Sequence, residues 1–178
     1  MNKKKLVTEM GRNDRDAFAQ SQKLPLVVVL DNVRSLHNVG SVFRTSDAFR
    51  VECIMLCGIT ATPPSAEIHK TALGAEDVVD WKYYESTMDA VAELRSQDYR
   101  IYSIELCQGS IALQDFVTAP GERYAVVLGN EVKGVQQDVV DASDGAIEIP
   151  QFGTKHSLNV SVTAGMVIWE FAKKMGLV

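Results

Sequence analysis

The sequence predicts an α/β fold, in which a single domain has a parallel sheet with helices on both faces. A continuous apolar run at 26–30 is typical of a strand that is buried on both sides. Strand-like and helix-like segments alternate along the chain, which favours parallel strands. The chain has 178 residues, of which 46% are hydrophobic and 23% are charged, as expected of one ordinary globular domain.

Three strands and three helices are predicted in the first half of the chain. The strands are expected at 26–30, 53–57 and 78–83, and the helices at 38–49, 66–73 and 87–96. Asn38 and Ser86 stand where the first and third helices begin, and both residue types are common N-caps. Gly74 is placed to end the second helix. A long loop with two consecutive prolines precedes that helix.

The second half continues the alternation and ends in a very apolar helix. Strands are expected at 100–106, 124–128 and 146–149, and helices at 135–142 and 158–175. One face of the last helix has Leu158, Val162, Gly165, Trp169 and Ala172, and another has Val160, Ala164, Val167, Ile168 and Phe171. Such a helix either contacts a second copy of the chain or lies at the centre of a monomer. Symmetric dimers are the commonest oligomers, which favours the first interpretation.

Charge is unevenly distributed along the chain. The net charge of −5 is not typical of a simple nucleic-acid-binding protein, which usually has a basic face. Residues 1–25 nevertheless carry a net charge of +3, so the rest of the chain carries −8. We expect a short basic N-terminal extension at 1–24 and one domain at 25–178. The extension either contacts phosphate groups or is a solubilising terminus.

Composition also predicts the cellular setting. No stretch approaches the roughly 20 apolar residues of a membrane span, and no signal-peptide core follows the basic N-terminus. Cys53, Cys57 and Cys107 all lie in apolar segments that resemble strands, and an odd number of buried thiols suits a reducing compartment. We therefore expect a cytoplasmic protein. A metal site is not expected, because Cys53 and Cys57 have no further ligands nearby.

Asn38 and Arg44 are the first candidate site residues. They lie six positions apart on the predicted helix 38–49, nearly two turns from each other. Arg44 has apolar neighbours, so we expect part of its side chain to lie near the core and to require a partner. That partner is either an internal carboxylate, such as Asp47 or Glu131, or a bound phosphate, whose oxygens match the guanidinium.

Gly129-Asn130-Glu131 is the second candidate segment. It directly follows the predicted strand 124–128, and a glycine there allows the backbone to approach a ligand closely. Glu131 then lies at the carboxyl end of a strand, which is a favoured functional position in open α/β sheets. The alternative interpretation is a plain turn with a solvated carboxylate.

The third candidate segment joins the last predicted strand to the last helix. The strand stops at Pro150, a polar loop with Gly153 follows, and the helix is expected to begin at Ser157. Strand, loop and helix N-terminus together are a common geometry for ligand binding. N-capping explains Ser157 but not Asn159, which is a poor helix former. His156 is either a general base or an exposed loop residue, and a glycine-rich dinucleotide fingerprint is missing.

Together, the three segments resemble the signature motifs of the SpoU–TrmH family of RNA ribose 2′-O-methyltransferases. Residues 38–45 match the first motif, including its Asn and Arg. Gly129-Asn130-Glu131 with 133–134 matches the second motif, and 149–162 matches the third. The motifs occur in the family's order, and the resemblance covers nearly the whole chain, residues 25–175.

The resemblance implies a knotted fold, a cofactor and a dimer. Members of the family have a deep trefoil knot in the C-terminal part of the domain, a rare exception among protein folds. They bind S-adenosylmethionine in a bent form within the loops of the knot. By this resemblance the cofactor pocket is lined by Leu128, Gly129, Ile149, Ser157 and Leu158. Family members are homodimers whose active site takes residues from both subunits.

The implied reaction is methyl transfer to a ribose 2′-oxygen, whose proton must leave as the methyl group arrives. The resemblance assigns this chemistry to Arg44, Asn38, Glu131, Ser157 and Asn159. In the family the Arg of the first motif is proposed to take part in deprotonation. Its high pKa makes it a poor free base, so holding a phosphate and stabilising the alkoxide is the better physical role for Arg44. The other four would position ribose, Arg44 and cofactor.

The RNA substrate is less well defined by the sequence. The amino-acid sequence of residues 149–160 is most similar to the third motif of the family branch that methylates guanosine in the D-loop of tRNA. The short flanks and the acidic body argue against an extended tRNA contact. Methylation of rRNA and a non-catalytic RNA-binding relative are the alternatives. An unrelated nucleotide-dependent α/β enzyme is disfavoured by the missing glycine fingerprint.

Overall fold

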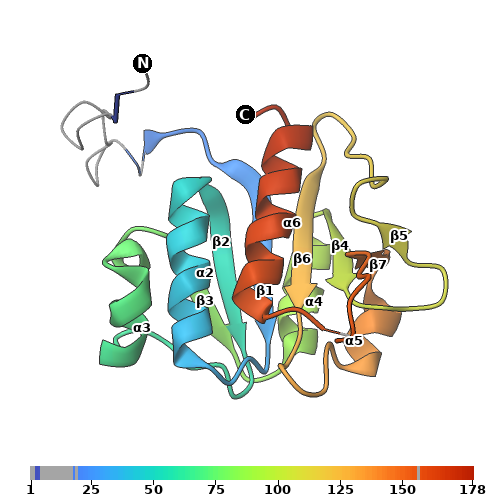
Figure 1. Cartoon of the computed structure of the whole chain (residues 1–178), viewed down its shortest axis with the longest axis horizontal. Helices are drawn as coiled ribbons and strands as arrows, with labels where there is room; N and C mark the ends of the chain where they lie inside the picture. Colours follow the sequence, from blue (N-terminus) through green and yellow to red (C-terminus); the bar gives the residue numbers. More distant parts are fainter. Residues whose placement is uncertain (1–2, 5–17, 19, 156) are drawn as a thin grey trace.

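The computed structural model describes residues 3–4, 18, 20–155 and 157–178. Within that part of the chain, one parallel sheet has the strand order β3-β2-β1-β6-β4-β7-β5 (Figure 1). The strands are β1 (Leu24–Asp31), β2 (Val51–Cys57), β3 (Trp81–Tyr84), β4 (Tyr99–Ile104), β5 (Ile111–Ala112), β6 (Arg123–Leu128) and β7 (Gly145–Glu148). The helices are α2 (Leu36–Ala48), α3 (Ala66–Ala72), α4 (Thr87–Ser96), α5 (Gln137–Ala142) and α6 (Val160–Lys174). The predicted α/β fold with a parallel sheet is confirmed.

Helices cover both faces of the sheet (Figure 1). Leu26, Val28 and Leu30 of β1 belong to a buried cluster that also includes side chains of α2, α3 and α6. Val27 and Val29 point to the other face, into a cluster with side chains of α4 and α5. The apolar run at 26–30 therefore fills two cores, because successive side chains of a strand point to opposite faces.

The start of a helix differs from the prediction at two places that concern site residues. Ser35 caps α2, since its side chain accepts a hydrogen bond from the Asn38 backbone N–H, so the predicted N-cap Asn38 lies inside the first turn. Asn159 caps α6, because its side chain accepts from the backbone N–H groups of Ser161 and Val162. The expected helix start at Ser157 is therefore wrong. Asn159 is a cap rather than a poor helix former inside the helix.

Local contacts explain the other differences. Residues 78–80 are not part of a strand, because Val78 and Val79 donate to the Ala75 carbonyl at the end of a 3₁₀ turn, Ala75–Asp77. Helix α3 ends at Ala72, and Leu73 adopts a left-handed C-cap ahead of Gly74. Two boundaries also moved, since β4 ends at Ile104 and α5 begins at Gln137. The two-residue strand β5 was missed because so short an element has no periodicity to detect.

The structure places two of the three cysteines in a strand and the third in a loop. Cys53 and Cys57 lie in β2, and burial raises the pKa of each thiol to about 12, but Cys107 lies in the loop after β4 rather than in a strand.

Helix α6 buries Val160, Ala164, Val167, Ile168, Phe171 and Ala172, while Val162, Met166 and Trp169 are exposed. Ala172 thus belongs to the buried face, not to the face predicted for it. None of the described helices is long and apolar enough to span a membrane.

The sheet order determines where a ligand can bind. Strands β1, β6, β4 and β7 are neighbours and parallel, so their carboxyl ends lie along one edge. The loop after β1 leads into the first motif on α2. The loop after β6 contains the second motif, and the loop after β7 contains most of the third. In open α/β sheets, ligands bind outside the carboxyl ends of the strands.

Candidate active site

A pocket of about 650 Å³ opens at the carboxyl ends of β4, β6 and β7. Its wall includes every residue predicted to line a cofactor pocket: Leu128, Gly129, Ile149, Ser157 and Leu158. Glu131 and Asn159 also line it, whereas Asn38 and Arg44 do not. Its volume lies within the usual range for small-molecule and cofactor sites. The structure thus brings the second and third motifs together around one cavity.

Glu131 connects the pocket to the start of α2. Its carboxylate accepts hydrogen bonds from the backbone N–H groups of Arg34 and Ser35, both at 2.9 Å. It also accepts from the Asn38 side-chain amide at 3.3 Å. Glu131 is an exposed turn residue, but its carboxylate is not merely solvated, because it holds two backbone N–H groups of a loop that lies 96 and 97 residues away in sequence.

Asn38 extends this connection to the third motif. Its side-chain oxygen accepts a hydrogen bond from the Asn159 amide at 3.1 Å. Asn159 in turn accepts from the Ser161 N–H at 2.9 Å, which orients the first turn of α6. One residue of each motif therefore participates in a continuous series of hydrogen bonds, Glu131–Asn38–Asn159, along the edge of the pocket.

Arg44 lies elsewhere on α2 than the sequence suggested. The buried residues of that helix are Val39, Gly40, Val42, Phe43 and Ser46, and Arg44 is exposed. Its guanidinium has no hydrogen-bond or ion-pair partner among the described residues. The expected partial burial and the internal ion pair are both wrong, since helical geometry turns Arg44 away from its apolar neighbours. A phosphate partner stays a prediction.

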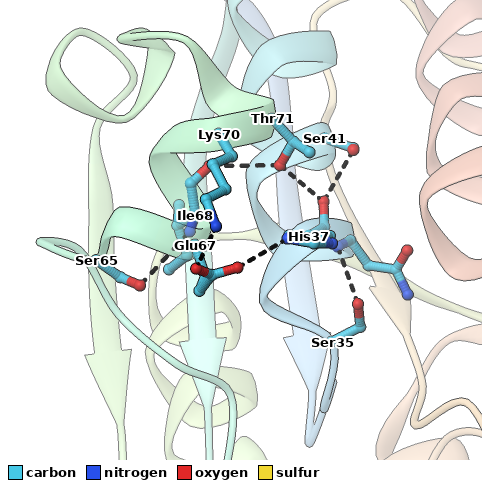
Figure 2. A network of polar contacts seen from close by, with 9 residues as sticks. Ser35, His37, Ser41, Ser65, Glu67, Ile68, Lys70 and Thr71 are labelled. Atoms are coloured by element: carbon cyan, nitrogen blue, oxygen red, sulfur yellow. Dashed lines mark hydrogen bonds and ion pairs between the residues drawn. The ribbon is translucent and has the colours of Figure 1, made fainter.

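Helix α3 supports the part of α2 that carries Asn38 (Figure 2). The Thr71 hydroxyl donates to the His37 carbonyl at 2.9 Å, and the Glu67 carboxylate lies 3.0 Å from His37 Nε2. A methyl group at Gly40 would lie only 2.2 Å from both the Ile68 carbonyl oxygen and the Thr71 hydroxyl. The two helices are therefore in close contact exactly where α2 presents Asn38, so Asn38 sits on a rigid support.

Gly129 and Asn130 build a tight turn beside the pocket. Asn130 and Gly134 exchange two backbone hydrogen bonds, at 3.0 and 2.9 Å. The Asn130 side chain also donates to the Asn32 carbonyl at 2.7 Å, which ties the turn to the loop after β1. A Cβ atom on Gly129 would lie 2.1 Å from the Gly134 carbonyl carbon. Glycine is required at position 129 because the backbone of Gly134 and Val135 lies so close to it. The close approach of a ligand, for which the sequence suggested this glycine, would be a second reason.

Glu105 is a pocket residue that the sequence reasoning missed. Its carboxylate accepts from the backbone N–H groups of Leu106 at 2.9 Å and Val135 at 3.0 Å, so it joins two of the loops around the pocket. Glu148 also lines the pocket and accepts from the Ser110 hydroxyl at 2.6 Å. The position of an acidic residue at the carboxyl end of predicted strand 100–106 was the available signal.

Comparison with known proteins decides the family of this chain. The model of the SpoU rRNA Methylase family matches residues 25–169. This chain belongs to the SpoU rRNA Methylase family. The family predicted from the three motifs is therefore confirmed.

Relatives of this SpoU protein are named for different RNA substrates. A 23S rRNA (guanosine-2′-O-)-methyltransferase, RlmB, of Vibrio parahaemolyticus is 29% identical over 170 residues, 96% of this chain and 68% of the relative. A tRNA (guanosine(18)-2′-O)-methyltransferase of Aquifex aeolicus is 30% identical over 158 residues, 88% of this chain and 72% of the relative. A putative TrmH family tRNA/rRNA methyltransferase of Staphylococcus haemolyticus is 31% identical over 165 residues and is spanned to 65% by this chain.

Solved structures agree with the SpoU assignment. The AdoMet-bound rRNA methyltransferase of Sinorhizobium meliloti superposes with a TM-score of 0.78 at 26% identity, covering 89% of this chain. This chain spans 59% of the length of that protein.

Three further points about the SpoU site concern metal binding, His156 and Ser157. Among the described residues, no group of three or more His, Cys, Asp or Glu side chains is arranged to hold a metal ion. His156, considered as a general base, lies outside the described residues. Ser157 lines the pocket and is exposed, and its role stays a prediction.

The hydrogen bonds of Glu131 predict a pH dependence of stability. Burial raises the pKa of Glu131, but donors from Arg34, Ser35 and Asn38 outweigh it, so the pKa lies below its usual 4.5. A carboxylate with a lowered folded pKa stabilises the protein above its unfolded pKa, and this contribution is lost as the pH falls through the folded value. We expect Glu131→Gln to lower the free energy of unfolding by about 1 kcal/mol near pH 7 and to have little effect below the lowered pKa.

Urea unfolding between pH 3 and pH 7 checks this expectation. Glu85→Gln is the matched control, because the exposed Glu85 carboxylate has no hydrogen-bond or ion-pair partner in the described chain. A Glu131→Gln deficit that stays constant over the whole pH range would contradict the role of the ionised carboxylate.

Proposed function

We propose that this protein transfers a methyl group from S-adenosylmethionine to a ribose 2′-hydroxyl of RNA. The observation that supports the proposal most strongly is the series Glu131–Asn38–Asn159, which joins the three family motifs at the edge of a cofactor-sized pocket. Relatives with matching sequence are named as guanosine 2′-O-methyltransferases of rRNA and of tRNA. Membership of the SpoU family gives the same class of reaction.

The pocket suits S-adenosylmethionine by shape and charge. Glu105, Glu131 and Glu148 line it together with one cation, Lys133. An acidic wall favours a cofactor that carries a positive sulfonium. We place the cofactor against Leu128, Gly129, Ile149, Ser157 and Leu158, and the AdoMet-bound relative from Sinorhizobium meliloti supports this choice of cofactor. When bound, the cofactor supplies an electrophilic methyl group.

Arg44 has the central catalytic role in this proposal. A guanidinium stays protonated in proteins, so it acts by charge rather than as a free base. It holds the phosphate next to the target ribose and stabilises the negative charge that develops on the 2′-oxygen. Arg44 is exposed and has no hydrogen-bond or ion-pair partner among the residues that the structure describes, which leaves its guanidinium available for this contact. Asn38, Glu131, Ser157 and Asn159 position the ribose and the cofactor.

We further propose that two copies of the chain form a homodimer through α6 and that Arg44 acts in the pocket of the partner. Arg44 does not line the pocket of its own chain. Trp169 is 49% exposed and Val162 is 52% exposed on the face of α6 that points away from the core. Trp169 packs edge-on against Phe49 at the end of α2, with ring centroids 5.7 Å apart. This apolar face therefore adjoins the helix that carries Arg44.

A charge on the exposed face of α6 should separate the dimer. We expect Val162→Glu to sediment as a monomer and to lose methyl transfer, because a carboxylate is costly to bury in an apolar interface. Val117→Glu, at an exposed apolar position after β5, should leave the oligomeric state unchanged. Wild-type protein that is monomeric at assay concentrations would rule out the dimer.

Mixing two inactive variants tests whether Arg44 acts across the interface. Arg44→Ala and Asn159→Ala are each expected to be inactive. A mixed dimer contains one complete site only if Arg44 and Asn159 of that site come from different chains. Recovered activity therefore supports the shared site, and no recovery in a sample shown to contain mixed dimers contradicts it.

We also infer that the C-terminal segment is threaded into a trefoil knot. Strand β7 lies between β4 and β5, whereas α6 packs beside α2, so the described residues of the connection, 149–155 and 157–159, lead across the ends of β4 and β6. The loops after β4 and β6 line the same pocket as this crossing segment. A crystal structure tests the inference: residues 149–159 passing through the loop of 105–136 support the knot, and passage outside that loop contradicts it.

The proposed substrate is a guanosine in the D-loop of tRNA. The similarity of 149–160 to the tRNA-modifying branch supports it, as does the tRNA-specific name of the Aquifex aeolicus relative. A guanosine of rRNA is the second candidate, favoured by the RlmB name of the Vibrio parahaemolyticus relative. In either case we place the protein in the cytoplasm, where its three free cysteines stay reduced.

Transfer of a labelled methyl group from S-adenosylmethionine to unmodified total RNA tests the function. The RNA is separated afterwards into tRNA-sized and rRNA-sized pools. Label in the small pool supports the tRNA substrate, and label only in the large pool supports rRNA. Calorimetry with S-adenosylhomocysteine runs in parallel. Cofactor binding without any label contradicts catalysis by this chain alone, and no binding contradicts the cofactor site.

A further inference from the structure

A loop next to the pocket carries an exposed aromatic side chain, that of Phe152. Gln151 and Ser157 both line the pocket, and the described residues between them, 152–155, are all exposed. Phe152 is 98% exposed, more than any other large apolar side chain among the described residues. In Figure 1 the segment after β7 runs across the end of the sheet to the start of α6. Phe152 therefore directly follows a residue that lines the proposed methyl-transfer site, and its ring is open to solvent.

Phe152 is not an isolated apolar side chain on this surface. Leu106 and Val132 line the same pocket and are 66% and 77% exposed. Scattered single apolar residues are normal on a protein surface, but a group around the rim of a pocket indicates a binding site. The rim thus offers an apolar contact next to the acidic interior of the pocket.

Eight of the fifteen described Lys and Arg side chains have no carboxylate partner among the described residues, and two of these eight lie at or beside the pocket. Seven of the described Lys and Arg side chains form ion pairs with carboxylates: Lys70, Lys82, Arg95, Arg100, Arg123, Lys173 and Lys174. Lys133 lines the pocket and Lys155 lies on the same loop as Phe152, and neither has a carboxylate partner in the described chain. Unpaired cations on an otherwise acidic protein are available to phosphate groups.

We propose that Phe152 stacks on a base of the RNA beside the target nucleotide, while Lys133 and Lys155 contact the neighbouring phosphates. An exposed aromatic ring between cations is the chemistry that binds unpaired nucleotides, because every base has a face for stacking. The inference rests on the proposed function, since it takes RNA as the partner of this pocket. It explains how a protein with a net charge of −5 holds a polyanion.

Four variants test the stacking contact and the phosphate contacts separately. Phe152→Ala should weaken binding of an in vitro transcribed tRNA or of a 23S rRNA fragment roughly 10- to 100-fold. Phe152→Trp should retain the affinity, because its ring also stacks. Lys133→Ala and Lys155→Ala should each reduce the slope of log Kd against log salt concentration by about 0.7 to 0.9. Lys82→Ala is the matched control, since Lys82 is paired with Glu93 on the far side of the sheet.

Each variant is also measured for S-adenosylhomocysteine affinity and for oligomeric state. For Phe152→Ala and Lys155→Ala, unchanged values of both with weakened RNA binding support the proposal. Phe152→Ala that binds RNA like the wild type overturns it, and so does Phe152→Leu that binds as tightly as Phe152→Trp. A loss of cofactor affinity identifies the loop as a cofactor cover instead, and dissociation of a dimer identifies it as a contact between copies. Wild-type protein that binds neither RNA contradicts the proposed function itself.

Discussion

Replacing Arg44 by Ala is expected to lower kcat for methyl transfer by about 10²- to 10⁴-fold, with little change in cofactor affinity. The guanidinium is exposed and has no partner in the described chain, so its removal breaks no hydrogen bond or ion pair with the described residues. We expect the free energy of unfolding to stay within about 0.5 kcal/mol of the wild type. The change should therefore affect catalysis without affecting the folded state.

Two further variants make the Arg44 prediction specific. Arg44→Lys keeps the positive charge but not the planar fork, so it should recover only part of the activity. Arg100, at the start of β4, forms an ion pair with Glu122. The control variant Arg100→Ala removes this arginine and should behave like the wild type. Single-turnover kinetics at saturating RNA separate the chemical step from binding. An Arg44→Ala enzyme with wild-type kcat would remove Arg44 from the mechanism.

Replacing Gly129 by Ala is expected to abolish cofactor binding and to lower the free energy of unfolding by about 3 kcal/mol. The added methyl group would lie 2.1 Å from the Gly134 carbonyl carbon and 2.2 Å from the Val135 nitrogen. Both are backbone atoms, so the turn itself must move. Because this turn lines the pocket, its displacement changes the cofactor site directly.

Gly153→Ala is the matched control for Gly129→Ala. Gly153 lies on the loop at the other side of the pocket, and a methyl group there would have no atom within 4 Å. Calorimetry with S-adenosylhomocysteine and urea unfolding should show wild-type values for this variant. Equal effects of the two substitutions would mean that close backbone approach at Gly129 is not what shapes the pocket.

Sequence patterns predicted the layers of the fold better than the ends of its elements. The apolar run at 26–30 identified the central strand, because a strand buried on both faces must be apolar at every position. Helix starts were harder, since Ser35 and Asn38 are both good caps. In the fold, Ser35 is the cap, and its N–H donates a hydrogen bond to Glu131, in a distant part of the chain. No local pattern contains that contact.

The candidate site was predictable in its residues but not in its connections. Glu131, Asn38 and Asn159 were identified by resemblance, yet the hydrogen bonds between them span 93 and 121 positions of the sequence. Arg44 was misplaced because its sequence neighbours are apolar, although the helix turns it toward solvent. Glu105 escaped notice because its role depends on the Val135 N–H, which only the folded chain brings within reach.

The central claim is that this SpoU protein methylates the ribose 2′-oxygen of RNA. The most direct test is mass spectrometry of nucleosides after incubation of unmodified RNA with the protein and S-adenosylmethionine. We expect 2′-O-methylguanosine to form with the wild type and to be absent with Arg44→Ala. A guanosine methylated on its base, or the same product from both proteins, would contradict the claim.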